Sequence, residues 1–308
     1  MHYICCQPSV NYYTWQVELL INNFLNTGKI PGCNIHIVLG HYGNVPETWL
    51  RLMKEYTFEY GVNFYFYQDT RGNYPYIPSI YFHLMAKFLR DNPAMQEETL
   101  FLHDCDILFT KDVLAEFDVF KEGPEFYLSD TNSYINYDYV VSKGEQQFID
   151  MCAVVGVQPE VVKKYNKHSG GGQYICKNLK PELFDKTEAD SVKLYKLLCH
   201  NEPRYKDGVP IQKWTAGMWA FLWNIWLSGV ETVVDKRLDF VTGTDPYEKV
   251  QEVSIYHNAG VTDGMTKTHF FKGDYINRLP FKRDLHLGNN GSRWYYEQIR
   301  ELEVISIL

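Results

Sequence analysis

The chain has 308 residues, of which 45% are hydrophobic and 22% charged, values that exclude intrinsic disorder, collagen-like repeats and a coiled-coil rod. A formal charge of −8 argues against a broad surface for nucleic acid. The 7 cysteines are scattered without a Cys-x-x-Cys pair, which favours the reducing cytoplasm over a disulfide framework or structural zinc. No targeting segment is evident, and the longest apolar run, Trp214 to Leu227, is shorter than the roughly 20 residues of a membrane-spanning helix.

Strand and helix patterns alternate through the first half of the chain. The expected strands are His2–Cys6, Asn34–Leu39, Val62–Tyr67, Thr99–Phe109 and Glu125–Leu128, and the expected helices are Trp15–Leu25, Trp49–Tyr56 and one that Ser79 caps and that runs to about Arg90. This alternation predicts an α/β fold in which helices flank a mostly parallel central sheet. The second half is less regular, with a glycine cluster at Ser169–Gly172 and an all-buried helix at Trp214–Leu227.

Two carboxylates, Asp104 and Asp106, interrupt the apolar segment Thr99–Phe109. In an extended segment, residues two apart point to the same side, so we expect both carboxylates to face one way. Such a pair repels itself unless a cation lies between, and hard oxygen donors favour Mg²⁺ or Mn²⁺. The pattern therefore predicts a divalent-metal site, with a solvated strand end as the alternative.

An apolar strand, Asp-Cys-Asp and a second apolar strand resemble the Asp-x-Asp motif of GT-A glycosyltransferases. The resemblance implies a single Rossmann-like GT-A domain over residues 1–308, with a nucleotide-sugar-binding half (1–130) and an acceptor-binding half (131–308). It also implies that Mn²⁺ or Mg²⁺ binds the diphosphate of a nucleotide-sugar, usually a UDP-sugar. Asp106 would ligate the metal directly, and Asp104 would support the metal and contact the ribose.

Further donor-binding candidates follow from the same resemblance. Relatives often use an acidic residue and an arginine after the third strand, positions that Asp69 and Arg71 match here, although a surface ion pair would explain Arg71 equally well. Gln7, at the end of the first strand, is a candidate for reading uracil. Gly171 and Gly172 precede an apolar strand and would let the backbone approach the sugar, and a tight turn without ligand is the alternative.

A histidine in the C-terminal third would complete the metal site. The segment around His269 and Lys272 resembles the C-terminal metal-site segment of glycogenin-like enzymes, and His257 is nearly as good a candidate. Lys272 would neutralise the leaving diphosphate. Either histidine has the ordinary alternative of a hydrogen-bonded polar residue.

The group that activates the acceptor hydroxyl is the weakest part of the pattern. Inverting relatives carry a carboxylate base near the start of a late helix, whereas Gln212–Met218 contains none. Asp130 is then the leading polar group near the reacting sugar, with Gln212 and Gln173 as alternatives, and a retaining mechanism is favoured. The stretch Trp214–Trp219 also looks somewhat like the peptidyl-serine galactosyltransferase and hydroxyproline arabinosyltransferase group.

These features together predict a metal-dependent glycosyltransferase that transfers a sugar to a hydroxyl of a glycan or glycoconjugate. An aromatic content of 16% fits the stacking of sugar rings. The alternatives are a carbohydrate-binding relative without catalysis and a metal-dependent hydrolase in which Asp104 and Asp106 hold ions that activate water.

Overall fold

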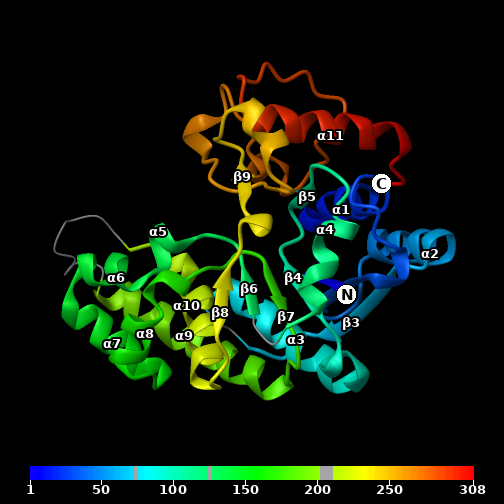
Figure 1. Ribbon diagram of the computed structural model, residues 1–308. Coiled ribbons are helices and arrows are strands. Elements are labelled where there is room, and N and C mark those ends of the chain that lie inside the picture. Colours follow the sequence, from blue (N-terminus) through cyan, green and yellow to red (C-terminus); the bar gives the residue numbers. More distant parts are fainter. Residues whose placement is uncertain (73–74, 124–125, 202–210) are drawn as a thin grey trace. The chain divides into compact units, whose positions relative to one another are not determined.

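The computed structural model describes residues 1–72, 75–123, 126–201 and 211–308 (Figure 1). Glu125, with which the fifth expected strand begins, lies outside the described residues. The chain forms two compact units, unit 1 from residues 1–68, 103–122 and 237–308, and unit 2 from 69–102 and 123–236. The units alternate along the chain, and the assignment of a donor half and an acceptor half stays a prediction.

Unit 1 begins as a parallel β/α arrangement. Its first elements are β1 His2–Pro8, α1 Thr14–Asn26, β2 Ile35–His41, α2 Glu47–Tyr60 and β3 Asn63–Gln68. β1 pairs with β2 and β2 with β3, both in parallel. β1 is buried from Tyr3 to Gln7, as is usual for a parallel strand covered on both faces.

The rest of unit 1 is a small second sheet and its covering helix. The elements are β5 Ile107–Phe109, α4 Leu114–Asp118, β9 Phe240–Thr242, β10 Ile255–His257 and α11 Gly291–Ile305. β10 lies between β5, to which it is antiparallel, and β9, to which it is parallel. An aromatic core that includes Trp15, Tyr256, Phe270 and Tyr295 joins α1, β10 and α11.

Unit 2 carries the remaining strands and most of the helices. Its elements are α3 Ile80–Asp91, β4 Leu100–His103, β6 Phe126–Leu128, α5 Asn132–Ile135, α6 Tyr137–Lys143, α7 Glu145–Val155, α8 Pro159–Lys164, β7 Tyr174–Cys176, α9 Pro181–Asn201, α10 Ala216–Leu227 and β8 Thr232–Val234. The long helix α9 packs against both α3 and α10 (Figure 1). β7 runs antiparallel to β4 and to β6.

The predicted α/β class is confirmed. Seven strands follow the order β3-β2-β1-β4-β7-β6-β8 in a mostly parallel sheet flanked by helices. The reversal at β7 is a feature that the strand-and-helix alternation does not reveal. Among the described residues, none of the helices combines the length and the apolar character that a membrane crossing requires.

Two local expectations are wrong. Thr99–Phe109 is not one strand, because the chain turns at Cys105 and Asp106 and β5 belongs to the second sheet. Ser79 stands at the N-cap position of α3, but its hydroxyl does not cap the helix. That hydroxyl instead donates to the carbonyl oxygen of Tyr76 and accepts from Arg71.

The side chain of Asn23 fixes β5 against α1. Its amide donates to the carbonyl oxygen of Phe109 (2.9 Å) and accepts from the Phe109 backbone N–H (2.7 Å). Removing a partner from buried backbone groups costs more than the bond itself contributes, because the groups stay desolvated. We expect Asn23→Ala to lower the free energy of unfolding by about 2–4 kcal/mol in urea titrations. Asn26→Ala, at an exposed site of the same helix, is the control, and equal losses would contradict the assignment.

His36 makes acid stability a second testable feature. It lies buried in β2, with Nε2 2.9 Å from His2 Nδ1, and burial together with the charge of His2 lowers the pKa of His36 to about 3. An unfolded histidine binds its proton near pH 6.5. The unfolded state therefore binds more protons between these values, and the free energy of unfolding should decrease as pH falls from about 6.5 towards 3. His36→Gln should flatten this decrease in urea titrations, whereas an unchanged slope would refute it.

Candidate metal centre

Strand pairing brings His257 beside the two aspartates within unit 1. β5 and β10 pair antiparallel in a register that sets His257 opposite Ile107, the residue after Asp106. The backbone N–H of Asn258 donates to the carbonyl oxygen of Asp106 (3.0 Å) and extends this pairing. The pairing thus joins residues 150 positions apart in the sequence, which local patterns do not reveal.

Asp104, Asp106 and His257 form one group of potential ligands. Each offers one ligand atom, and these atoms lie within 4.8 Å of one another. His257 Nε2 is 3.5 Å from an oxygen of each aspartate. The side chain of Asp104 is 57% exposed and that of Asp106 only 6%, so the turn at 105–106 gives the two carboxylates different surroundings. The segment is not the extended strand that was expected, but the two carboxylates still lie on the same side, next to His257.

Lys272 adds a cation to the group. Its ammonium donates to Oδ2 of Asp106. The residue opens a short 3-10 turn, Lys272–Tyr275, and the neighbouring rings of Phe270 and Tyr275 pack edge-on against Trp15. The aromatic core of unit 1 therefore holds the segment that presents Lys272.

The charges of this group keep Asp106 ionised. Burial alone would raise the pKa of Asp106, but the charges of Lys272 and His257 outweigh it and hold that pKa well below its usual range. Burial would also lower the pKa of Lys272, and the Asp106 carboxylate raises it instead. Burial would likewise lower the pKa of His257, but the Asp106 carboxylate raises it. Asp106 is consequently a carboxylate throughout the neutral range, the form in which it ligates metal.

Two residues near this group were not anticipated from the sequence. Tyr12 follows β1, and burial, opposed in part by the charge of Lys272, raises its pKa to about 12. Asn258 follows His257 directly, and its buried Nδ2 has no partner in the structure. In the sequence only their positions point to them, because Tyr12 follows a predicted strand and Asn258 follows a candidate ligand.

The donor set fits a divalent cation of intermediate softness. Carboxylate oxygens suit Mg²⁺ and Mn²⁺, whereas an imidazole nitrogen suits transition metals. Two carboxylates with one imidazole therefore fit Mn²⁺ better than Mg²⁺. His269 is not in this group; its Nδ1 lies 2.9 Å from the hydroxyl of Thr268.

Gln7 also lies in unit 1. It is buried near the end of β1, and its carboxamide has only a weak contact with the thiol of Cys5 among the described residues. A buried carboxamide whose hydrogen bonds are left largely unmade is costly unless a ligand or water completes them. Gln7 is thus poised to pair with a group that offers both a donor and an acceptor.

Asp69 and Arg71 lie in unit 2 and bind each other. The guanidinium donates to both carboxylate oxygens, at 3.0 and 2.8 Å, and its remaining Nη1 donates to the Ser79 hydroxyl (2.7 Å) and the Ile77 carbonyl (3.1 Å). Both side chains are buried. The pair is therefore a buried bidentate contact and not the surface ion pair considered as its alternative.

Asp130, Gly171 and Gly172 also belong to unit 2. Asp130 is exposed after β6, and its Oδ1 accepts from the backbone N–H of Asn132 (2.9 Å). A Cβ on Gly171 would come within 2.6 Å of Met218 and of Tyr174, and Gly172 adopts φ +86°. Close packing and a left-handed turn thus account for both glycines, and a contact with the sugar stays a prediction.

No protein-family model and no curated protein matches the chain. Several solved structures are similar to it. The WbbM bifunctional glycosyltransferase is 11% identical at a TM-score of 0.47 over 97% of this chain, which spans 51% of that chain. The galactosyltransferase LgtC, in complex with donor and acceptor sugar analogues, is 13% identical (TM-score 0.45; 97% of this chain, 95% of that chain). Mouse xyloside xylosyltransferase 1 is 13% identical (TM-score 0.43; 83% and 97%). All three are glycosyltransferases.

The contact of Lys272 with Asp106 can be tested by stability. Removing one partner of a largely buried ion pair leaves a charge without compensation. We expect Lys272→Met to lower the free energy of unfolding by about 1–3 kcal/mol at neutral pH, measured by urea titration without added metal. Lys272→Arg keeps the charge and should lose less. A Met variant as stable as the wild type would show that the pair contributes nothing.

Proposed function

We propose that this chain is a metal-dependent glycosyltransferase that uses a UDP-sugar and transfers its sugar to a hydroxyl of a glycan or glycoconjugate. The observation that carries the proposal is the group of Asp104, Asp106 and His257, whose ligand atoms lie within 4.8 Å of one another. It combines the Asp-x-Asp pattern with a histidine from a distant strand. A solvated strand end does not account for a buried Asp106 that lies between the ammonium of Lys272 and the imidazole of His257.

These residues would hold the cation, and Mn²⁺ suits them best. When bound, it would act as a Lewis acid that stabilises negative charge on the departing diphosphate. Lys272, already beside Asp106, would bind the same diphosphate through its ammonium. The protein contributes a fixed cluster of charges and forms no covalent bond itself.

Gln7 would read the base of the donor. The imide edge of uracil offers an N–H donor flanked by carbonyl acceptors, which complements the donor and acceptor of a carboxamide. The burial of Gln7, whose amide has only the weak thiol of Cys5 beside it, supports this role. Asp69 and Arg71 remain candidates for contacts with the ribose or the rest of the donor. Because the two side chains bind each other, such contacts would use only the atoms that this pairing leaves exposed.

On the acceptor side, Asp130 is the residue proposed to contact the sugar. Asp130 is exposed and retains a carboxylate oxygen beyond its bond to Asn132, so it suits contact with a sugar. Gln173 is buried and accepts from the Ser129 hydroxyl (2.6 Å), which makes it the less available alternative. The lack of a carboxylate in Gln212–Met218 still favours a retaining mechanism.

The cysteines are all free thiols, which supports a reducing, cytoplasmic location.

Asp106→Asn is the direct test. The variant keeps the side-chain shape but removes the buried charge that holds the metal. For the wild type, UDP at about 100 times its Kd should add about 2.7 kcal/mol of stability in thermal unfolding, and only with Mn²⁺ present. The variant should lose this stabilisation and the release of UDP from UDP-sugars. Asp118→Asn, at an exposed aspartate paired with Lys121, is the matched control and should behave as the wild type.

A panel of nucleotide-sugars with Mn²⁺ would identify the donor by UDP release, since slow transfer to water needs no acceptor. UDP binding that is equally strong without metal would refute the proposal. Glycan binding without release of UDP from any donor would instead indicate a carbohydrate-binding protein.

A further inference from the structure

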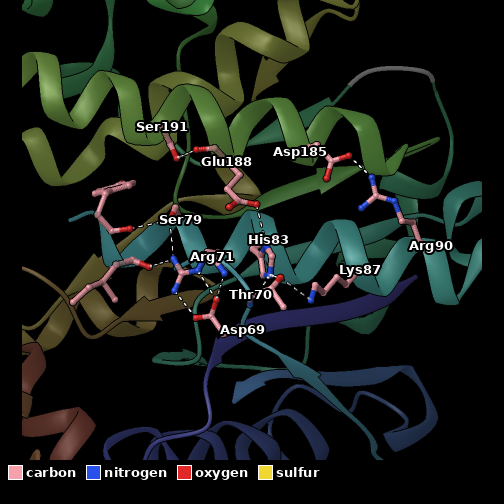
Figure 2. Close-up of polar contacts among 12 residues, drawn as sticks. Asp69, Thr70, Arg71, Ser79, His83, Lys87, Arg90, Asp185, Glu188 and Ser191 are labelled. Atoms are coloured by element: carbon pink, nitrogen blue, oxygen red, sulfur yellow. Dashed lines mark hydrogen bonds and ion pairs between the residues drawn. The ribbon is translucent and has the colours of Figure 1, made fainter. Parts of the chain in front are cut away.

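A chain of side chains in unit 2 joins a lysine, a threonine, a histidine and a glutamate (Figure 2). Lys87 Nζ lies 3.3 Å from Oγ1 of Thr70, and that oxygen lies 3.2 Å from Nε2 of His83. On the other side of the ring, Nδ1 lies 3.0 Å from Oε2 of Glu188. Thr70 is exposed, so a small molecule can reach its hydroxyl.

The hydrogen bonds among these four side chains all run in one direction, from Lys87 towards Glu188. The backbone N–H of Thr70 donates towards Nε2 of His83 (3.4 Å), so that nitrogen carries a lone pair and Nδ1 carries the proton given to Glu188. Lys87 can only donate, so Oγ1 of Thr70 accepts from it and has its own proton available for Nε2. A hydroxyl, a base that accepts its proton and a carboxylate that orients the base are the parts of an activated nucleophile.

Neighbouring contacts hold these groups in place. His83 and Lys87 are one turn apart on α3 and share a face, and Glu188 comes from α9, which packs against α3. Thr70 sits between Asp69 and Arg71, whose bidentate contact fixes the backbone on both sides of it. An ion pair between Arg90 and Asp185 joins the same two helices further along (Figure 2).

We propose that Thr70, His83 and Glu188 form a second reactive site, which transfers acyl groups from small carboxylic esters to water. The proposal is independent of the glycosyltransferase function, because it uses none of the residues of the metal centre. Lys87 supplies a positive charge beside Oγ1 of Thr70, and in the tetrahedral intermediate this charge would stabilise the negative charge on the carbonyl oxygen of the bound ester.

The reaction proceeds in two balanced steps. Thr70 Oγ1 attacks the ester carbonyl carbon as its proton moves to His83 Nε2; the bond from that carbon to the leaving oxygen then breaks, and the alcohol departs with the proton from His83. Water next attacks the acyl-threonine and gives a proton to His83. Cleavage of the acyl–Oγ1 bond returns this proton to Thr70 and releases a carboxylic acid. Ester and water become acid and alcohol, without change of oxidation state.

The test uses the full chain and p-nitrophenyl acetate. The wild type should release p-nitrophenolate and carry an acetyl group on the peptide that contains Thr70, mapped by mass spectrometry. Thr70→Val should abolish both signals, Thr70→Ser should restore them, and His83→Gln should slow acylation about 100-fold. Glu188→Gln, at a residue that acts through His83, should lower kcat and leave KM unchanged.

Thr48→Val is the matched control, since the Thr48 hydroxyl contacts Asn11 and no imidazole among the described contacts. It should react as the wild type does. Circular dichroism and thermal unfolding of each variant separate loss of reaction from loss of fold. Acetylation confined to other residues, or unchanged turnover in a folded Thr70→Val variant, would overturn the proposal.

Discussion

The electrostatic balance around Asp106 is the interaction on which the candidate site depends. A carboxylate buried to this degree is unstable as an anion without compensation, and here the Lys272 ammonium and the neighbouring His257 imidazole provide it. The Asp106 carboxylate raises the pKa of Lys272 and of His257, and these two residues lower the pKa of Asp106, in each case against the effect of burial. Lys272 and His257 do not favour each other's charged form, because the ammonium lowers the pKa of His257. The site is consequently a cluster of fixed charges, which suits a cation and a polyanionic diphosphate better than an uncharged ligand.

Strand register delivers these charges to one place. A one-residue slip between β5 and β10 would turn the His257 side chain to the other face of the small sheet and remove it from Asp106. Asn23 acts against such movement, because its amide completes the hydrogen bonds of Phe109, two residues beyond Ile107. Tyr256, next to His257 in β10, stacks on Tyr295 of α11 and anchors β10 to the aromatic core. Packing and backbone pairing thus determine the electrostatics.

The sequence predicts the first half of the fold well, because strands such as β1 and β2 are short apolar runs between helices of clear period. It predicts the structure less well where the backbone departs from the strand or helix that the apolar pattern indicates. The turn at Cys105 and Asp106 lies within an apolar segment that reads as one strand, so the different exposure of the two aspartates is not predictable from spacing. The choice of His257 over His269 as neighbour of the aspartates depends on long-range register, which single-sequence patterns do not contain. Ser79 was expected to cap α3, but Arg71 competes for its hydroxyl through a tertiary contact.

Asp69 and Asp106 are both buried carboxylates that pair with basic side chains, but they differ in a way that bears on their roles. Asp69 meets a planar guanidinium at both oxygens, a geometry that is rigid and directional. Asp106 meets an ammonium on a flexible stem at one oxygen and an imidazole at 3.5 Å from the other. A point charge on a long side chain can move aside with little change in the backbone, whereas a bidentate fork that also binds Ser79 cannot. Asp106 is therefore the carboxylate suited to exchange its partner for a metal, and Asp69 the one suited to hold a loop in a single shape.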